Sequence, residues 1–263
     1  MEVSILPPST FRTSQTSLSD QIIVSGLTFN TGAGAYTITC PPGQFFTIID
    51  GITDNSAAIQ SFPATVDLAG NSGGFQLQGG SAGGSTSFTN EARTTAEGSS
   101  GNVQFIIDAS AGSATFLNEG GVVPGAGGGE TIFYDHSTAA TATITNEGGL
   151  VSGASGGLTW FAFDPASAGD SVITSQGAAV GGAFGGKTLF DDISSAGNGI
   201  LIANAGSNGG GGGLIQFVSK SKDGTAQIKL FGNGSLDISV HEGGLTIGSL
   251  EGSGQVLVGA AKP

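Results

Sequence analysis

The side chains best suited to chemistry in this sequence are four aspartates that recur at nearly constant spacing. They are Asp108, Asp135, Asp164 and Asp191, separated by 27, 29 and 27 residues. If each interval is one structural repeat, the carboxylates would stack ~5 Å apart along an axis. Stacked carboxylates can hold Ca²⁺ or, beside a base, can act on acidic sugars. Calcium binding at Asp135, Asp164 and Asp191 and carbohydrate cleavage are therefore the two candidate chemistries of the row.

A structural interpretation of the same row is favoured over both. Each aspartate follows a phenylalanine, but by three, two, three and one residues, so its register within the repeat drifts. Lys187 is the single basic residue that faces the row, and the calcium-binding nonapeptide G-G-x-G-x-D is absent. Asp is also a preferred turn residue. We therefore expect a solvated row of turn residues, with no catalytic residue, bound metal or cofactor.

Two aromatic residues form a second candidate site. Tyr134 and Trp160 fall in adjacent repeats, at positions where the alternation points side chains outward. An exposed pair of this kind could stack on sugar rings, and we name it as a candidate carbohydrate contact. The alternative is that the two rings extend the core or a packing patch.

The segment 181–188, GGAFGGKT, matches the phosphate-binding pattern G-x-x-x-x-G-K-[ST]. That mechanism needs a helix after the loop, whose N-terminal amides hold the phosphates. The following residues, Leu189 and Phe190, instead begin the next repeat strand, and the same place in the preceding repeat has no lysine. The segment is therefore interpreted as a turn of the repeat.

The tripeptide Gly169-Asp170-Ser171 resembles the nucleophile segment of serine proteases. The next residue is Val172, where that motif requires glycine. The two histidines, His136 and His241, lie more than a hundred residues apart, so a Ser-His-Asp set is hard to assemble. We interpret this segment as a turn as well.

The elements that would position all these residues belong to one sequence repeat, which occurs four times. The copies are FIIDASAGSATFLNEGG from Phe105, FYDHSTAATATITNEGG from Phe133, FAFDPASAGDSVITSQG from Phe161 and FDDISSAGNGILIANAG from Phe190. Their phenylalanines are 28, 28 and 29 residues apart, and further copies are expected from Phe75 and Phe217. A fixed period in this range indicates a repeat architecture.

Within each copy, alternation of apolar and polar residues predicts strands. An example is Val103, Phe105 and Ile107 around Gln104. The second apolar position is expected at Phe88, Phe116, Ile144, Ile173 and Ile202, and the polar position two residues later at Asn90, Asn118, Asn146, Ser175 and Asn204. Stacked coils would align these residues into Phe, Ile and Asn ladders, with the 49 glycines serving the corners. The sequence thus predicts an all-β, single parallel β-helix with ~28-residue coils, right-handed as parallel crossovers usually are.

Composition limits the partners. The net charge is −13 with seven Lys and Arg residues, so nucleic acid and anionic membrane surfaces would be repelled. Cys40 is the single cysteine, which excludes an intrachain disulfide, and we expect it buried on a strand. No run of 18 apolar residues and no signal peptide is present.

One continuous solenoid is expected along the chain. We expect a leader or N-terminal cap at 1–25, irregular first coils at 26–74, regular coils at 75–232 and tight final coils at 233–263. Nothing after Val258 offers a polar cap, so the native chain is expected to continue, or the C-terminal coil to self-associate.

The repeat resembles a known family. The unit F-x-D-x-S-(S/T)-A-G-x-(A/S)-x-I-x-N-x-G-G, followed by DGTAQIKLFGNGSLDIS and LTIGSLEGSGQVLVG, is similar to the passenger region of autotransporter-type β-helix proteins of bacteria. The resemblance covers roughly residues 26–259. It implies a right-handed parallel β-helix that is exported and presented at the cell surface, in adhesion or as a stalk.

Together these features predict a non-enzymatic extracellular stalk or adhesin-like passenger, with a surface glycan or a host or biofilm matrix as its possible partner. The alternative is a polysaccharide-binding or polysaccharide-cleaving β-helix. An enzyme should show a mixed acid–base cluster or a bound metal in one cleft, whereas a stalk should show uniform rows along its length.

Overall fold

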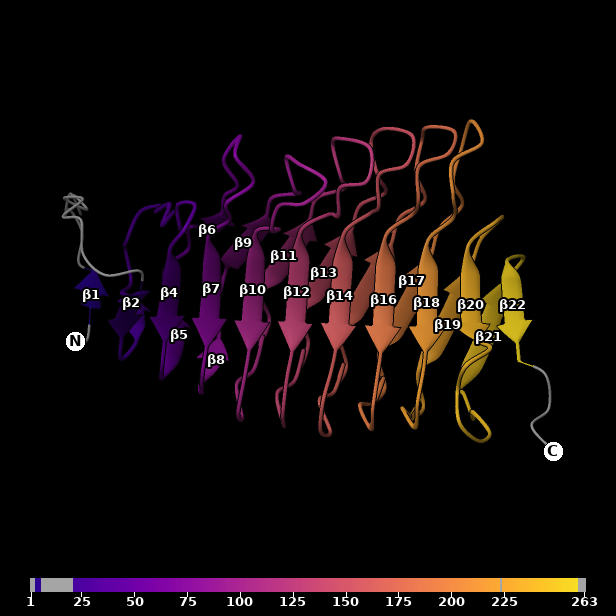
Figure 1. Cartoon of the computed structure of the whole chain (residues 1–263). Helices are drawn as coiled ribbons and strands as arrows, with labels where there is room; N and C mark the ends of the chain where they lie inside the picture. The colour runs from indigo at the N-terminus through magenta and orange to yellow at the C-terminus, as the bar shows by residue number, and fades with distance from the viewer. Residues whose placement is uncertain (1–2, 6–20, 223, 260–263) are drawn as a thin grey trace.

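The chain winds into a parallel β-solenoid, seen from the side in Figure 1. The computed structural model describes residues 3–5, 21–222 and 224–259. Every pair of strands in the sheets of this part is parallel, and coils of about 28 residues stack along one axis. The predicted all-β parallel solenoid is therefore confirmed. The described residues contain no helix, and so none with the length and apolar character needed to cross a membrane.

Three sheets run along the axis, here called the long, the second and the short sheet. In spatial order the long sheet contains β2 (Gln21–Val24), β4 (Phe45–Ile48), β7 (Gly74–Leu77), β10 (Asn102–Phe105), β12 (Glu130–Phe133), β14 (Leu158–Phe161), β16 (Lys187–Phe190), β18 (Leu214–Phe217), β20 (Ser235–Ile238) and β22 (Gln255–Val258). The second sheet contains β6 (Gln60–Ala64), β9 (Thr86–Asn90), β11 (Thr115–Asn118), β13 (Thr143–Asn146), β15 (Val172–Ser175), β17 (Ile200–Ala203), β19 (Gln227–Leu230) and β21 (Ser249–Gly252). The short sheet contains β1 (Val3–Ile5), β3 (Leu27–Phe29), β5 (Gly51–Asp54) and β8 (Ser81–Ala82).

The short sheet ends at β8, and single bridges continue its side of the solenoid. The bridged residues are Ser81, Ser110, Thr138, Ser167, Ser195 and Lys222. Each central coil is therefore held by two strands and one bridge, which leaves its remaining residues for corners and loops.

Alternation within the strands sets the core. From β14 to β18, strands of the long sheet alternate half-buried and buried residues. The buried phenylalanines at their ends form one column, Phe105, Phe133, Phe161, Phe190 and Phe217, whose neighbouring ring centroids lie 4.7 to 4.8 Å apart at 3° to 11°. This spacing equals the ~4.8 Å separation of paired strands, so each ring stacks directly on its neighbour.

The position expected for the Phe75 copy is wrong by two residues. Phe75 pairs with Val103, and Leu77 pairs with Phe105. Each strand of the long sheet has two inward positions, and a phenylalanine can fill either of them. Phe75 does pair with Phe46, the 29-residue partner that the spacing suggested.

The expected ladders also need correction at β17. Leu201 rather than Ile202 lies beside Ile173, and Ile202 faces outward. Asn204 falls one residue past the strand, where its amide donates to Gln176 Oε1 at 2.8 Å. The corner segment before β17 is one residue shorter than the one before β15. A position in β17 that is assigned at the same distance from the preceding phenylalanine as in β15 is therefore one residue too late.

The remaining asparagine ladder is structural, as predicted. Asn118 Nδ2 donates to Asn146 Oδ1 at 2.7 Å and to Leu158 O at 3.0 Å. Its Oδ1 accepts from Asn90 Nδ2 and from Thr131 Oγ1, both at 2.8 Å. All three amides are fully buried. Each amide therefore links two coils and joins the second sheet to the long sheet. Asn90 Oδ1, at the end of the ladder, has no partner within the part described.

Several expectations concern the ends of the chain. Within the expected leader 1–25, residues 1–2 and 6–20 lie outside the described part, but β1 pairs with β3 and β2 with β4. At the other end the long sheet closes with shorter coils, since Leu214 pairs with Ser235 and Ser235 with Gln255. Residues 260–263 of the expected final coils lie outside the described part.

Cys40 is buried as predicted, although in an isolated bridge with Ala64 rather than in a strand. Burial raises the pKa of its thiol to about 11, so the thiol stays protonated at neutral pH. The residue therefore acts as a small apolar side chain of the core.

Candidate functional site

Three aromatic side chains gather on the outer surface near β12 and β14. The centroids of the Tyr134 and Trp160 rings lie 6.3 Å apart at 63°. Phe163 joins them, with its ring centroid 5.9 Å from that of Tyr134 and 6.1 Å from that of Trp160. The structure thus brings the predicted aromatic pair together and adds a third ring. We call Tyr134, Trp160 and Phe163 the aromatic cluster.

Sequence alternation missed Phe163 because it places residue 163 on the same inward phase as Phe161. The chain instead bends after the strand, where Phe163 has a φ of 50°, and its side chain is 54% exposed. The same corner rotates Ile107, with a φ of 63°, out of the core, contrary to the alternation expected for it. The sequence signal that could have identified the corner is the Asp-Pro pair that follows Phe163.

Trp160 is the centre of an apolar strip across three strands. It lies in register with Ile132 of β12 and Leu189 of β16, on the outward phase of the long sheet. Its indole Nε1–H is shielded from solvent and has no hydrogen-bond partner in the part of the chain described. A buried donor without a partner costs ~1–3 kcal/mol, so this strip is less stable than its apolar contacts alone would make it.

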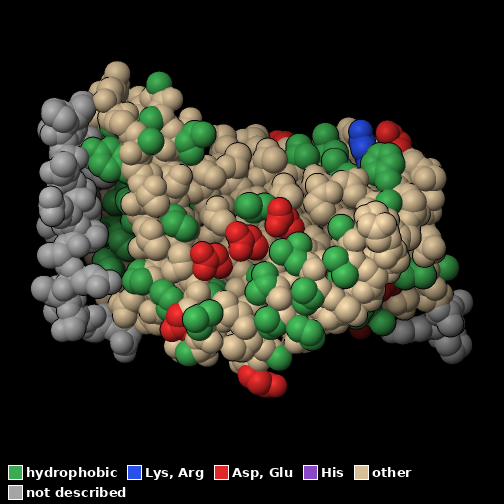
Figure 2. Space-filling model, turned by 90° about the horizontal axis from the view of Figure 1, so that it is seen from above, with side chains coloured by type: hydrophobic (Ala, Val, Ile, Leu, Met, Phe, Trp, Pro, Cys, Tyr) green, Lys and Arg blue, Asp and Glu red, His purple; other side chains and the backbone are tan. Residues whose placement is uncertain are grey.

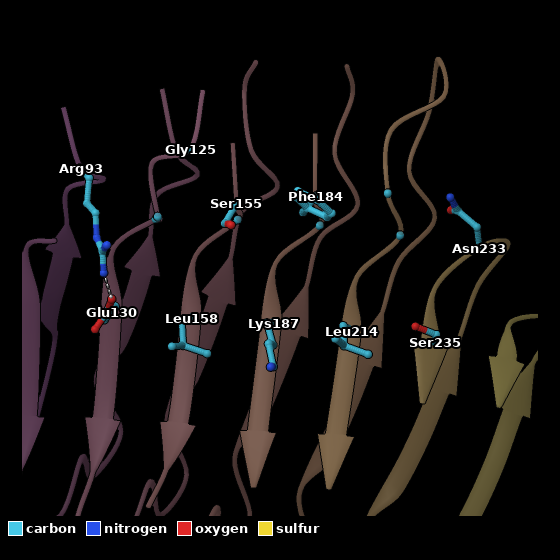
Figure 3. Close-up of a pocket in the computed structure, with 16 residues that line it drawn as sticks. Arg93, Gly125, Glu130, Ser155, Leu158, Phe184, Lys187, Leu214, Asn233 and Ser235 are labelled. Atoms are coloured by element: carbon cyan, nitrogen blue, oxygen red, sulfur yellow. Dashed lines mark hydrogen bonds and ion pairs between the residues drawn. The ribbon is translucent and has the colours of Figure 1, made fainter. Parts of the chain in front are cut away.

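A groove with a volume of about 590 Å³ runs along the axis where the strands of the long sheet begin. One residue per coil forms its row of side chains: Glu130, Leu158, Lys187, Leu214 and Ser235. Figure 3 shows this row below the loops that lead into the strands, with Phe184 above it. We call this feature the axial groove.

Glycine-rich loops form the wall of the axial groove. They stack through backbone hydrogen bonds, such as Gly125 N to Gly153 O at 3.0 Å and Gly153 N to Gly182 O at 2.8 Å. A Cβ at Gly156 would lie 2.5 Å from Glu147 O and from Gly185 O. These glycines are therefore needed for coil stacking itself, and their presence says nothing of a ligand.

Two basic side chains line the axial groove and differ in their partners. Arg93 Nη2 pairs with Glu130 Oε1 at 3.4 Å, and Arg93 Nε donates to Ser100 Oγ at 3.0 Å. The ammonium of Lys187 has no hydrogen bond or ion pair among the residues described. Burial lowers the pKa of Lys187, and the more distant carboxylate of Asp237 partly opposes this shift. The groove thus holds a half-buried ammonium without a partner.

Carboxylates form a separate row at the ends of the second-sheet strands. Glu91, Glu119 and Glu147 follow the asparagines of three successive coils, as Gln176 follows Ser175. Figure 2 shows acidic side chains aligned along the axis on the face that carries the loops. Burial, and then the charges of Glu91 and Glu147, raise the pKa of Glu119. The side chains of Glu91, Glu119 and Glu147 lie outside the core, and their negative charges repel one another.

The aspartate row is not brought together as a metal site. Asp135 occupies the corner, where its Oδ2 accepts from Ile107 N at 2.9 Å, whereas Asp191 follows β16 directly and accepts from Ser219 Oγ at 2.8 Å. Asp164 lies one residue after Phe163, which occupies the corner position that Asp135 occupies in the preceding coil. Within the part described, no group of three or more His, Cys, Asp or Glu side chains is arranged to hold a metal ion. The drift of register separates carboxylates that the spacing alone would align.

The two catalytic motifs also lack the geometry of their mechanisms. The segment 181–188 leads into strand β16, with no helix to hold a phosphate. Ser171 is fully buried with no partner for its hydroxyl among the described residues. His136 is exposed, and His241 Nε2 lies 2.7 Å from Ser221 O, so neither histidine contacts that serine.

No protein-family model, curated protein or solved structure matches this chain. The resemblance to autotransporter passengers therefore rests on the repeat, and the functional argument rests on the coils, the aromatic cluster and the axial groove.

Proposed function

We propose that this chain is a non-enzymatic structural stalk, or adhesin-like passenger, presented outside the cell at a bacterial surface. The resemblance of the repeat to autotransporter passengers supports the location. The regularity of the coils supports the role, since a solenoid extends by adding units that contact only their neighbours.

The observation that carries this proposal is the unbroken phenylalanine column. Five rings from Phe105 to Phe217 stack at 4.7 to 4.8 Å without interruption. The asparagine ladder braces the same coils from the other sheet. A spacer requires this kind of interchangeable unit, whereas a catalytic cleft requires one coil to differ from its neighbours in chemistry.

Coil insertion tests the spacer role. Residues 133–160 form one coil, and a second copy inserted after residue 160 should fold and lengthen the rod by ~4.8 Å. The matched control inserts only residues 133–146, about half a coil, which would break the register of every later strand. Small-angle scattering and the distance between two end labels measure the change. In surface display with a fused membrane anchor, the longer variant should carry a terminal epitope with undiminished exposure.

A failure of the whole-coil insertion to fold, or a rod of unchanged length, would contradict the spacer role. So would depolymerisation of any polysaccharide by the purified chain, because a stalk needs no turnover. Self-association through the C-terminal coil stays a prediction, which light scattering over a range of concentrations tests. The exposed side chains at that coil include Leu250, Leu257 and Val258.

The aromatic cluster supports carbohydrate binding as a second candidate function. Phe163 is exposed and Tyr134 and Trp160 are half-buried, so parts of all three rings can stack on the apolar faces of sugars. The partner would be a surface glycan or the matrix of a host or biofilm. The test is binding to a glycan array, comparing the chain with Trp160→Ala. Phe231→Ala, at a phenylalanine 44% exposed outside the cluster, is the matched control. Equal binding by all three proteins would remove the cluster from this role.

A further inference from the structure

We propose that the outer face of β14 and β16 binds a carboxylated sugar within a linear glycan, with Lys187 as the residue that recognises the carboxylate. The inference rests on the proposed carbohydrate-binding function and adds the class of sugar and the residue that selects it. It depends on the placement of Lys187 beside Trp160.

The two side chains occupy neighbouring strands on one face. Lys187 pairs with Leu158, and Leu189 pairs with Trp160, so Lys187 and Trp160 stand diagonally across the strand pair. With parallel strands ~4.8 Å apart and a rise of ~3.3 Å per residue, the Cα atoms of two residues offset in this way are ~8 Å apart. In Figure 3 the amino group of Lys187 points along its strand away from the loops, toward the level of Leu189 and Trp160. A ring resting on Trp160 can therefore extend a substituent to the ammonium.

Lys187 carries a half-buried positive charge that an anion would neutralise. It stands half-buried in a row between Leu158 and Leu214 (Figure 3). The charges of Asp237 and Asp191 raise the pKa of Lys187, but neither carboxylate forms an ion pair with it. Asp237 Oδ2 already accepts a hydrogen bond from Gln216 Nε2 at 2.8 Å. A half-buried charge without a partner is unfavourable, and a carboxylate would supply that partner.

The direction of the axial groove suits a linear chain. Its row from Glu130 to Ser235 spans four strand spacings, or ~19 Å, parallel to the axis. Trp160 lies two residues after Leu158 on the same face, so the aromatic cluster borders this row. A linear polymer lying along the groove would pass Lys187 and present successive sugars to the rings.

Charge and backbone geometry favour a glycan over the other anionic polymers. A protein with a net charge of −13 repels nucleic acid, whose charge density is high. An acidic peptide commonly binds by adding a strand to a sheet edge, but β14 and β16 have neighbours on both sides. A glycan of uronic acids combines apolar ring faces with one carboxylate per sugar, a lower charge density than that of duplex nucleic acid, and these features match an aromatic cluster with an ammonium beside it.

Calorimetry with oligogalacturonate and oligomannuronate tests the inference, each compared with the same oligosaccharide after reduction of its carboxylates to alcohols. The wild-type chain should bind at least one acidic form roughly tenfold more tightly than its reduced form, the size of one charge-assisted hydrogen bond. Lys187→Met keeps the length of the side chain and should lose this preference, with unchanged affinity for the reduced form. Lys187→Arg should retain it. Lys220→Met, at an exposed lysine outside the axial groove, is the matched control.

The outcomes separate the two proposals. If Lys187→Met binds the acidic form as the wild type does, the assignment of Lys187 is wrong, while carbohydrate binding stands. Equal binding of the acidic and reduced forms would reject the carboxylate. If no oligosaccharide binds the folded chain, both this inference and the carbohydrate-binding function are overturned. Binding of oligoglutamate with the same dependence on Lys187 would reject the glycan as the occupant.

Discussion

The central coils and the N-terminal coils pack the same kind of residue in different ways. In the central coils the phenylalanines stack nearly parallel, as for Phe161 on Phe190 at 4.8 Å and 3°. Along the same sheet in the N-terminal coils, the paired rings of Phe46 and Phe75 are tilted, with centroids 5.9 Å apart at 45°. Phe161, Phe190 and Phe75 are fully buried and Phe46 is half-buried, so the N-terminal pair differs both in alignment and in burial.

Coil length explains the difference. In the long sheet, paired residues of the central coils are 27 to 29 apart, as for Glu130 with Leu158. In the N-terminal coils the separation varies with the side of the solenoid, from Leu27 with Ile52 to Phe46 with Phe75. Equal coils place equal residues above one another, and unequal coils do not. A ladder therefore forms where coil length varies little, and four changes to the sequence would break or sharpen the contrast.

The largest effect is expected from emptying the column. Phe133→Ala should reduce the free energy of unfolding by ~3–5 kcal/mol, because Phe105 and Phe161 are fixed at the strand spacing and cannot fill the space. Phe62→Ala should cost less, since Phe62 stacks on one ring, that of Phe88, and the edge-on rings beside it can rearrange. Urea denaturation measures both, with hydrogen exchange to show which coils open. Equal costs would mean that stacking order contributes nothing to rigidity.

The asparagine ladder should give the next largest effect. Asn118→Ala removes a side chain with five hydrogen bonds, so that the buried hydroxyl of Thr131 loses its acceptor and Asn90 Nδ2 loses one of its acceptors. The expected loss is ~2–3 kcal/mol. The N-terminal counterpart, Ala64, lies in register with Asn90 and has no such bonds. Ala64→Gly, which removes one methyl group at that position, is the comparison, and a larger loss there than at Asn118 would contradict the bracing role.

A smaller effect of opposite sign is expected at the corner. The N-terminal coils use Gly51 and Gly80 at positive φ there, whereas a central coil uses Ile107 with a φ of 63°. A β-branched residue in this region is strained by ~1 kcal/mol, so Ile107→Asn should raise the melting temperature. Ile193→Asn makes the same change at an exposed residue without positive φ and should not stabilise. Equal shifts for both would indicate an effect of polarity alone.

The smallest effect concerns the glutamate row, which the N-terminal coil lacks because Thr65 follows Ala64. The pKa of Glu119 is raised by burial and then by Glu91 and Glu147, so the folded state favours its protonated form. The contribution of Glu119 to stability is therefore present in full below its pKa in the unfolded chain. It is lost as the pH rises through its pKa in the folded chain. Glu119→Gln should therefore stabilise the chain at pH 7 but not at pH 4. Melting temperatures at both pH values test this, with Glu242→Gln, outside the row, as the control.

Much of the fold could be predicted because each inward position repeats in every coil. The spacing of the phenylalanines identified Phe105, Phe133, Phe161 and Phe190 as one column, and pairing confirms it. Less of the candidate site could be predicted. Tyr134 and Trp160 were identified because both occupy outward positions. Phe163 was missed because alternation assigns it an inward position, and Lys187 was assigned to the aspartate row because its place beside Trp160 depends on the register between strands.

The sequence by itself determined the period, the class of fold and the residues of the core, since these follow from local alternation multiplied over many copies. The tertiary structure alone decided the register wherever one coil gains or loses a residue, as at Ile202 and Asn204. A one-residue shift moves every later side chain to the other face of a strand. Which shift occurs is set by hydrogen bonds summed over the whole stack, and local sequence does not encode that sum. For the same reason only the folded coils bring Lys187 beside Trp160.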